Sequence, residues 1–356
     1  MKQKRLGGLC AAAIFLLCAL MTGFYLIAGY GAYLDSDMAS ELALASHLAK
    51  EGALISSTWA YSTEVRVLST QLVFTPLMAL FPHNWRLVRT LGCLILQAAL
   101  AASAYFCGRS LGARKRFALL FAGLSISVCS VVYAQMITIG AYYVPHAVLT
   151  NLYVGLTARL MTERKNGRRR GILALLCTLS VLMGASSIRY LFCATIPAAA
   201  AGVWAYLFPA GDESAPREER DQIGFLLTLI GFVFSVDGFL IGQKILPKIC
   251  DYDAARYGGV RLSAFTSADM PQMMQQALGG LARLMGYSEG SVLLSVHGLA
   301  SVGALLLPAA AAILMGRALK AARRDGNNVL RVGVLTLAMS AAITALSFVF
   351  LEDLYL

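Results

Sequence analysis

The run LCAAAIFLLCALMTGFYLIA (Leu9–Ala28) leads at once into YGAYLDSDMASELALASHLAKE (Tyr30–Glu51), and these two segments decide the fold. The first is apolar throughout and matches the ~20 residues that a helix needs to cross a bilayer. The second opens with Asp35 and Asp37 and adds Glu41 one helical turn later. Helical spacing of its apolar residues predicts an amphipathic helix over 37–50. That spacing is set by Met38, Leu42, Ala45 and Leu48 with Ala49.

The composition extends this pattern to the whole chain. Of its 356 residues, 58% are hydrophobic and 14% are charged, whereas soluble domains have about 25% charged residues. Apolar runs of bilayer length recur along the sequence, and Leu9–Ala28 is too long to be the apolar core of a cleaved signal peptide. We therefore predict an all-α polytopic transmembrane helix bundle that forms a single domain over residues 1–356.

The net charge of +11 is unevenly distributed. Basic residues gather in short connections between apolar runs, as the positive-inside rule predicts, so the charge indicates topology and no nucleic-acid partner. This pattern places the N-terminus in the cytoplasm. The basic clusters are MKQKR at the start, GRSLGARKR (108–116), ERKNGRRRG (163–171) and RALKAARRDGNNVLR (317–331).

Alternation of these clusters predicts about nine spanning helices. The segment Leu72–Phe81 is too short to span and contains Pro76, so the first outer loop is long, covering 31–87. It carries two interfacial helices, over 37–50 and 65–81. A second long outer loop covers 243–291. The expected spans are 9–30, 88–106, 117–134, 144–161, 172–186, 191–208, 223–241, 292–315 and 332–350.

The three acids after the first span have two interpretations. Asp and Ser are preferred N-cap residues, and acids in the first turn interact favourably with the helix dipole. In the first interpretation, Asp35 and Asp37 therefore do no more than cap a helix. Capping explains one acid better than three, because charge beside a bilayer is costly. The functional interpretation makes Asp35 or Asp37 a catalytic carboxylate.

A long outer loop directly after the first span, with an acidic pair at its start and two interfacial helices, resembles the GT-C class of membrane glycosyltransferases. This class includes the protein mannosyltransferases and the bacterial aminoarabinose transferases. The resemblance covers about 4–161 and implies inverting transfer from a polyprenyl-phosphate sugar to a glycan, lipid or protein acceptor. In that class an outer-facing carboxylate deprotonates the acceptor, a role that would fall to Asp35 or Asp37. Asp37 is slightly preferred, because Glu41 lies one turn further along the same helix.

The lipid-phosphate leaving group of such a reaction needs cationic contacts, and arginine suits phosphate best. Outer-side candidates are Arg66, Arg86, Arg89 and Arg189. Arg86 and Arg89 lie beside Trp85 and are equally typical of interfacial anchors. Arg189 lies between two apolar runs, which favours a paired or functional role.

The next outer turn, AQMITIGAYYVPHAV (134–148), contains no acid, unlike the second polar site of the resembled class. The turn offers Gln135, Tyr142, Tyr143 and His146. The last three are its candidate substrate contacts, although a lone histidine at a helix start is more often structural. A divalent metal, Mg²⁺ or Mn²⁺, would have Asp35 and Asp37 as ligands, with His146 the third candidate. Asp237 is a further candidate, because an acid inside an apolar run is a functional hypothesis by default.

Two other functions fit the same residues. One is a transporter or flippase for a lipid-linked or small polar substrate, although no internal repeat supports it. The other is a non-catalytic membrane assembly subunit in which the acids only cap a helix. No nucleotide-binding motif occurs, so a lipid-linked donor is expected at the cell membrane, with the active face extracytoplasmic.

Overall fold

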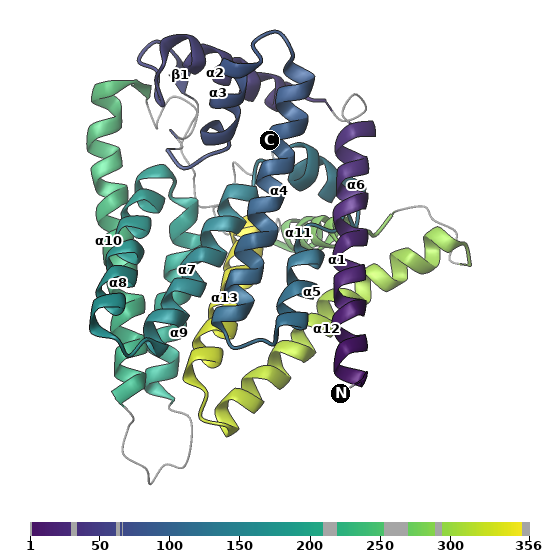
Figure 1. Cartoon of the computed structure of the whole chain (residues 1–356), viewed down its shortest axis with the longest axis vertical. Helices are drawn as coiled ribbons and strands as arrows, with labels where there is room; N and C mark the ends of the chain where they lie inside the picture. Colours follow the sequence, from purple (N-terminus) through teal and green to yellow (C-terminus); the bar gives the residue numbers. More distant parts are fainter. Residues whose placement is uncertain are drawn as a thin grey trace.

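The computed structural model describes residues 2–29, 34–61, 65, 67–208, 219–252, 270–288 and 294–350. Nearly all of them are helical, as predicted (Figure 1). The elements are α1 (Lys2–Ala28), α2 (Ser36–Glu51), β1 (Ala60–Tyr61), α3 (Gln71–Leu80), α4 (Trp85–Ser110), α5 (Lys115–Ser125), α6 (Val131–Tyr133), the π-helix η1 (Ala134–Ile139), α7 (Val144–Thr162), α8 (Asn166–Ser186), the π-helix η2 (Leu191–Thr195), α9 (Ile196–Leu207), α10 (Glu219–Ile249), β2 (Asp251–Tyr252), α11 (Met270–Leu284), α12 (Val296–Arg324) and α13 (Asn328–Phe350).

Five helical stretches are long and apolar enough to cross a membrane. They are Leu6–Ala28, Trp85–Ser110, Asn166–Ser186, Ile223–Ile249 and Gly298–Arg324. Each coincides with an expected span, which confirms the helical, membrane-type architecture in its main features. Shorter apolar helices lie at Gln71–Leu80, Leu191–Leu207 and Asn328–Thr344.

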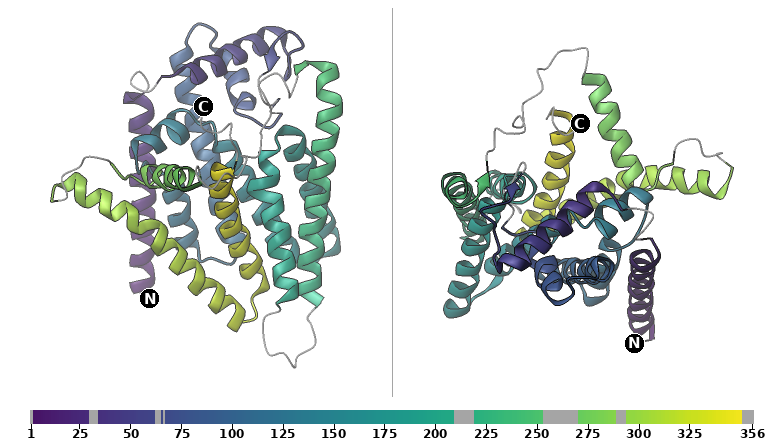
Figure 2. Two further views of the ribbon diagram at one scale, coloured as in Figure 1. Left: turned by 180° about the vertical axis from the view of Figure 1, so that it is seen from behind. Right: turned by 90° about the horizontal axis from the view of Figure 1, so that it is seen from above.

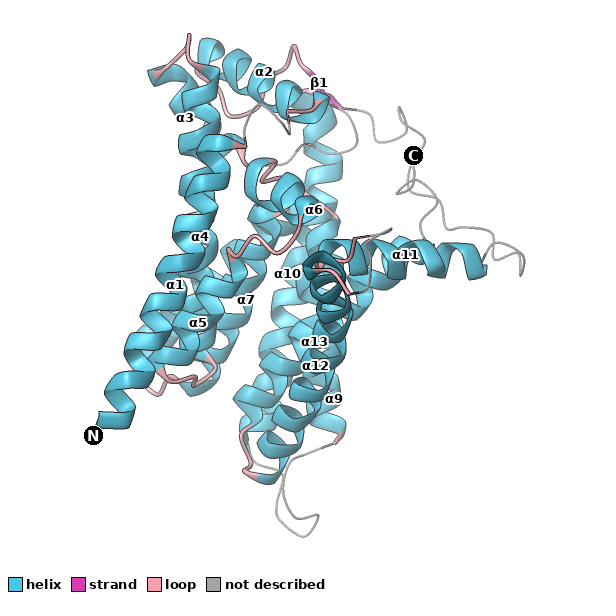
Figure 3. Ribbon diagram, turned by 90° about the vertical axis from the view of Figure 1, so that its right-hand side faces the viewer, coloured by secondary structure: helices cyan, strands magenta, loops and turns pink. Residues whose placement is uncertain are grey.

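The long helices run side by side, and α2 with α3 lies at one end of them (Figures 1 and 3). We call α2 and α3 the platform. From above, α2 crosses over the bundle, whereas α12 runs obliquely away from it (Figure 2). The platform therefore lies at one end of the bundle, where α3 packs against α4.

Local sequence explains α2. The Asp35 side chain accepts the Met38 backbone N–H at the N-terminus, and Gly52, with φ of 65°, ends the helix in the left-handed conformation. The predicted apolar stripe is confirmed, with Met38, Leu42, Ala45 and Leu48 all buried. Met38, Leu42 and Ala45 share a core with residues of α3 and α4, so much of the stripe packs on protein.

The basic connections lie at the end opposite the platform. The N-terminus and the α4–α5, α7–α8 and α12–α13 connections are all found there (Figure 1). Contacts support this arrangement, because Arg159 donates to the Ser110 hydroxyl at 3.2 Å and Arg331 donates to the Phe208 carbonyl. The bundle therefore separates the basic clusters at one end from the acidic stretch at the other.

The two predicted outer loops meet at the platform end. β1 pairs with β2 in parallel, with Ala60 opposite Asp251. Tyr61 and Val65 pack against Leu246 and Cys250 beside this pairing. Loop 31–87 thus contacts loop 243–291, which also contains α11.

One expected span, 117–134, is wrong as a continuous helix. α5 ends at Ser125, and α6 begins after Ser130, whose side chain caps it through the Tyr133 N–H. Hydroxyl groups satisfy carbonyls exposed at the break: Thr22 donates to Ile126 O at 2.6 Å and Tyr133 donates to Ser125 O at 2.5 Å. Apolar composition alone could not reveal a break that side chains stabilise in this way.

Candidate functional site

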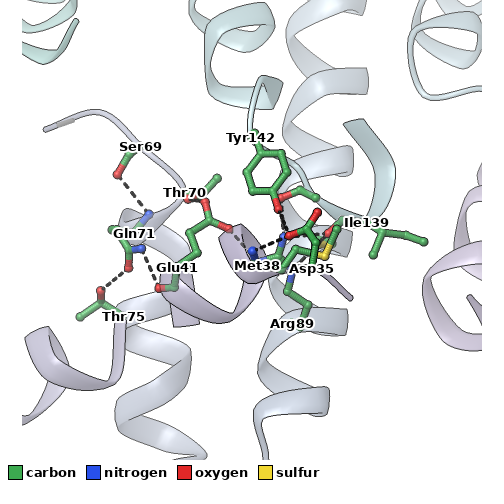
Figure 4. A network of polar contacts seen from close by, with 12 residues as sticks. Asp35, Met38, Glu41, Ser69, Thr70, Gln71, Thr75, Arg89, Ile139 and Tyr142 are labelled. Carbon is green, nitrogen blue, oxygen red and sulfur yellow. Dashed lines mark hydrogen bonds and ion pairs between the residues drawn. The ribbon is translucent and has the colours of Figure 1, made fainter. Parts of the chain in front are cut away.

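Asp35 lies at the junction of the platform and the bundle. Its Oδ1 accepts the Met38 N–H at 2.8 Å and the Tyr142 hydroxyl at 2.7 Å (Figure 4). Tyr142 comes from the turn between η1 and α7, far along the chain. One carboxylate oxygen therefore both caps α2 and holds this turn against it.

Glu41 and Arg89 form an ion pair directly beside this junction. Glu41 Oε2 lies 2.6 Å from Arg89 Nη1, and the Arg89 side chain is only 1% exposed. Arg89 also donates to the carbonyls of Ile139 and Gly140 and lies over the Phe74 ring. Its guanidinium is therefore enclosed and engaged, and it is not available to a substrate phosphate.

The π-helical geometry of η1 explains why Arg89 points toward the carbonyls of Ile139 and Gly140. A π-helix leaves carbonyls at its end without regular partners, and π segments are frequent at functional sites. The Ile137 carbonyl accepts from Gln97 at 2.6 Å, and the Ile139 carbonyl accepts from both Arg89 and Cys93. Buried side chains of α4 thus complete the hydrogen bonding of the turn that carries Tyr142.

The turn itself is strained. Ala141 is fully buried and has φ of 57°, which is rare for a residue with a side chain. Such strain persists only where surrounding contacts impose it, and it concentrates at functional sites. Here Arg89 holds the Gly140 carbonyl on one side and Asp35 holds the Tyr142 hydroxyl on the other.

Glu41 also joins the two platform helices. The Thr70 hydroxyl donates to Glu41 Oε1, and the Gln71 side chain donates to the Glu41 backbone carbonyl at 2.9 Å (Figure 4). Glu41 is therefore bonded to the start of α3 and to α4 at once. We call Asp35, Glu41, Arg89 and Tyr142 the platform junction.

The surroundings of Asp35 favour its charged form. Burial by itself raises the pKa of Asp35, but hydrogen bonds from Tyr142, the Met38 amide and Gln135, with the charge of Arg89, outweigh it and lower the pKa. Burial, the hydrogen bond to Asp35 and the charge of Asp35 raise the pKa of Tyr142. Asp35 is thus an anion at neutral pH that accepts a hydrogen bond from a neutral phenol.

Other predicted site residues lie elsewhere. Asp37 is exposed in the first turn of α2 and has no side-chain hydrogen bond or ion pair among the described residues. Glu41 does not assist it, because Glu41 pairs with Arg89. Arg86 is exposed and donates to the Ile27 carbonyl at 3.3 Å, at the end of α1. Arg66 lies outside the described residues, and Asp237 is on the exposed side of α10.

A second group surrounds the start of η2. The His146 ring stacks on Tyr190 with centroids 4.5 Å apart, and the Tyr143 ring lies 6.1 Å from His146. Tyr190 donates to the Leu68 carbonyl at 3.1 Å, and half-buried Arg189 is next to it in sequence. The structure therefore associates His146 with Tyr190 and, through it, with Leu68.

The proposed metal ligands do not assemble. In the described part of the chain, no group of three or more His, Cys, Asp or Glu side chains is placed to hold a metal ion. Asp35 is committed to Tyr142 and Met38, and His146 is stacked on an aromatic ring. The set of Asp35, Asp37 and His146 expected from the sequence is therefore not formed.

Sequence reasoning left several contributors out of its site. Gln135 reaches Asp35, while Thr70 and Gln71 reach Glu41. Polar residues beside the predicted turn and before the second platform helix were the only signal available for them.

No protein-family model, no curated protein and no solved structure matches this chain.

Proposed function

We propose that this chain is a multi-pass membrane glycosyltransferase that uses a polyprenyl-phosphate sugar, with Asp35 as the carboxylate that engages the acceptor hydroxyl. The observation that carries the proposal is the state of Asp35. It is a half-buried anion, fixed by Tyr142 and Met38 at the start of a platform that directly follows the first apolar helix.

In the proposed step, the acceptor oxygen attacks the anomeric carbon of the donor sugar. The new carbon–oxygen bond forms as the bond between the anomeric carbon and the phosphate oxygen breaks. The electron pair of the broken bond leaves with the lipid phosphate. The acceptor proton passes to Asp35. Because the acceptor oxygen displaces the phosphate in a single step, the anomeric configuration inverts. A carboxylate with a lowered pKa is a weak base, so orienting the hydroxyl is a large part of its role.

The proposed orientation places the platform on the extracytoplasmic side of the cell membrane and the N-terminus in the cytoplasm. The separation of basic connections from the platform supports this orientation through the positive-inside rule. About nine crossings would then arise from the five long helices together with α7, the η2–α9 helix, α13 and the broken α5–η1 segment.

The proposed phosphate contacts differ from the sequence-based set. Arg89 is excluded by its enclosure, whereas Arg189 is half-buried beside Tyr190 and His146. Arg189 is therefore the first candidate for the lipid phosphate. Arg86, on the exposed side of α4, is the second.

The test compares Asp35→Asn with Asp37→Asn in the purified full chain. Release of polyprenyl phosphate is measured with a panel of polyprenyl-phosphate hexoses and pentoses in detergent. Asn retains a carbonyl oxygen for Met38 and Tyr142 and caps helices about as well as Asp. Asp35→Asn should lower turnover by ~10²–10⁴-fold, the usual worth of general-base help, whereas Asp37→Asn should retain activity.

A non-catalytic assembly subunit is the second candidate, because the observed bond to Met38 is what helix capping requires. It predicts no turnover of any lipid-linked sugar by the wild-type chain. It also predicts that Asp35→Asn is neutral in every assay, while Asp35→Ala lowers stability by ~0.5–2 kcal/mol.

A further inference from the structure

α10 presents two different sides. Its inner side carries glycines that allow close approach to α8, since a side-chain carbon at Gly238 would overlap the Val181 carbonyl and one at Gly242 would press on Ala185. In the views of Figures 1 and 2, α10 lies at the edge of the bundle. Its outer side therefore faces away from the rest of the chain.

Asp237 belongs to this outer side. It is exposed and lies roughly 20 Å from either end of the apolar stretch Ile223–Ile249, at 1.5 Å of rise per residue. The residues exposed within one turn of it are apolar. They are Val233, Phe234, Leu240 and Ile241.

Nothing in the described chain pairs with this carboxylate. Asp237 has no hydrogen bond or ion pair with any described residue, and exposed Lys244 is two turns away, about 10 Å along the helix. Acids within membrane-spanning stretches are rare and normally pair with another group. An acid on this apolar, outward-facing surface thus lacks, within the described part of the chain, the partner that would offset its cost.

We propose that the outer side of α10 binds a transmembrane helix of another protein, and that this helix presents a lysine or arginine at the level of Asp237. Apolar side chains above and below would pack against Val233, Phe234, Leu240 and Ile241, while the cation neutralises the carboxylate. This inference rests on α10 crossing the bilayer and not on the transferase chemistry.

A second copy of this chain fits the surface poorly. A parallel pair related by a twofold axis along α10 would place Asp237 against Asp237 and Lys244 against Lys244. Like charges at close range in a medium of low dielectric constant repel strongly. The carboxylate therefore selects a partner of opposite charge over its own copy.

The experiment uses the full chain in lipid vesicles, labelled for energy transfer to synthetic transmembrane peptides. One peptide is a leucine helix with a single central lysine, and the control peptide has leucine at that position. The wild-type chain should bind the lysine peptide about 10-fold more tightly, the scale of one polar interhelical contact. Asp237→Leu should remove this difference.

Charge exchange gives the decisive comparison. Asp237→Lys should lose the lysine peptide and gain a matching peptide with central glutamate. Equal binding of the lysine and leucine peptides by the wild-type chain would overturn the proposal, because Asp237 would then contribute nothing to the choice of partner. Preferential self-association through α10, lost in Asp237→Leu, would also overturn it, and the comparison of peptides on the wild-type chain stands even if a variant does not fold.

Discussion

Glu41 Oε2 lies 2.6 Å from Arg89 Nη1, and this ion pair joins the first platform helix to α4 in a site where Arg89 is 1% exposed. Arg89 reaches further, to the carbonyls of Ile139 and Gly140 at the end of η1. Three segments distant in sequence therefore meet at one guanidinium. Removing either charge would leave the other enclosed without compensation.

Arg89→Ala is expected to lower the stability of the folded chain by ~3–5 kcal/mol, because it leaves Glu41 and two carbonyls without their donor. Arg86→Ala is the matched control, since Arg86 lies one turn earlier on the same helix and is exposed. Its loss should cost at most ~1 kcal/mol. Thermal unfolding in detergent measures both, and equal effects would contradict the structural role of Arg89.

Acid should weaken the platform junction through Asp35. Its pKa is lower in the folded chain than the ordinary value of 3.8. The group therefore contributes stability above that unfolded-state value, and the contribution is lost as pH falls through the folded-state pKa. Asp35→Asn should remove this part of the acid sensitivity, measured as unfolding midpoint against pH. Identical curves of unfolding midpoint against pH for the variant and the wild type would argue against this contribution of Asp35.

Tyr142→Phe should alter the titration of Asp35. The hydroxyl of Tyr142 stabilises the charged carboxylate, so its removal raises the pKa of Asp35. If Asp35 engages the acceptor, the acidic limb of the rate profile should move to higher pH. Tyr143→Phe is the control, because Tyr143 is adjacent and exposed. A profile unchanged by Tyr142→Phe would separate Asp35 from the rate-determining ionisation.

Gly184→Ala should disrupt the packing of α8 on α10. A side-chain carbon at Gly184 would overlap the Ser235 carbonyl oxygen, whereas one at Gly171, in the same helix, meets nothing within 4 Å. Overpacking of this kind costs ~1–3 kcal/mol. Gly171→Ala should instead be neutral or stabilise the helix by ~0.5–1 kcal/mol. The unfolding midpoint should therefore fall for Gly184→Ala and stay unchanged or rise for Gly171→Ala.

Much of the architecture followed from local patterns in the sequence. Apolar runs located the long helices, and the spacing of Met38, Leu42, Ala45 and Leu48 predicted the buried side of α2. Capping by Asp35 or Asp37 was one of two interpretations open from the sequence, because cap chemistry acts over three residues, and the bond to the Met38 N–H shows that Asp35 is the cap. Such features depend only on neighbours in the chain, so one sequence suffices for them.

The tertiary structure alone decided the roles of the charged residues. Arg86 and Arg89 are three residues apart in one motif, yet one is exposed and the other is enclosed with Glu41. Asp35 and Asp37 differ in the same way, since only Asp35 meets Tyr142. The outward position of Asp237 likewise depends on how α10 is rotated against α8. Composition and periodicity locate a helix, but its neighbours and its rotation about its own axis are set by packing between distant segments.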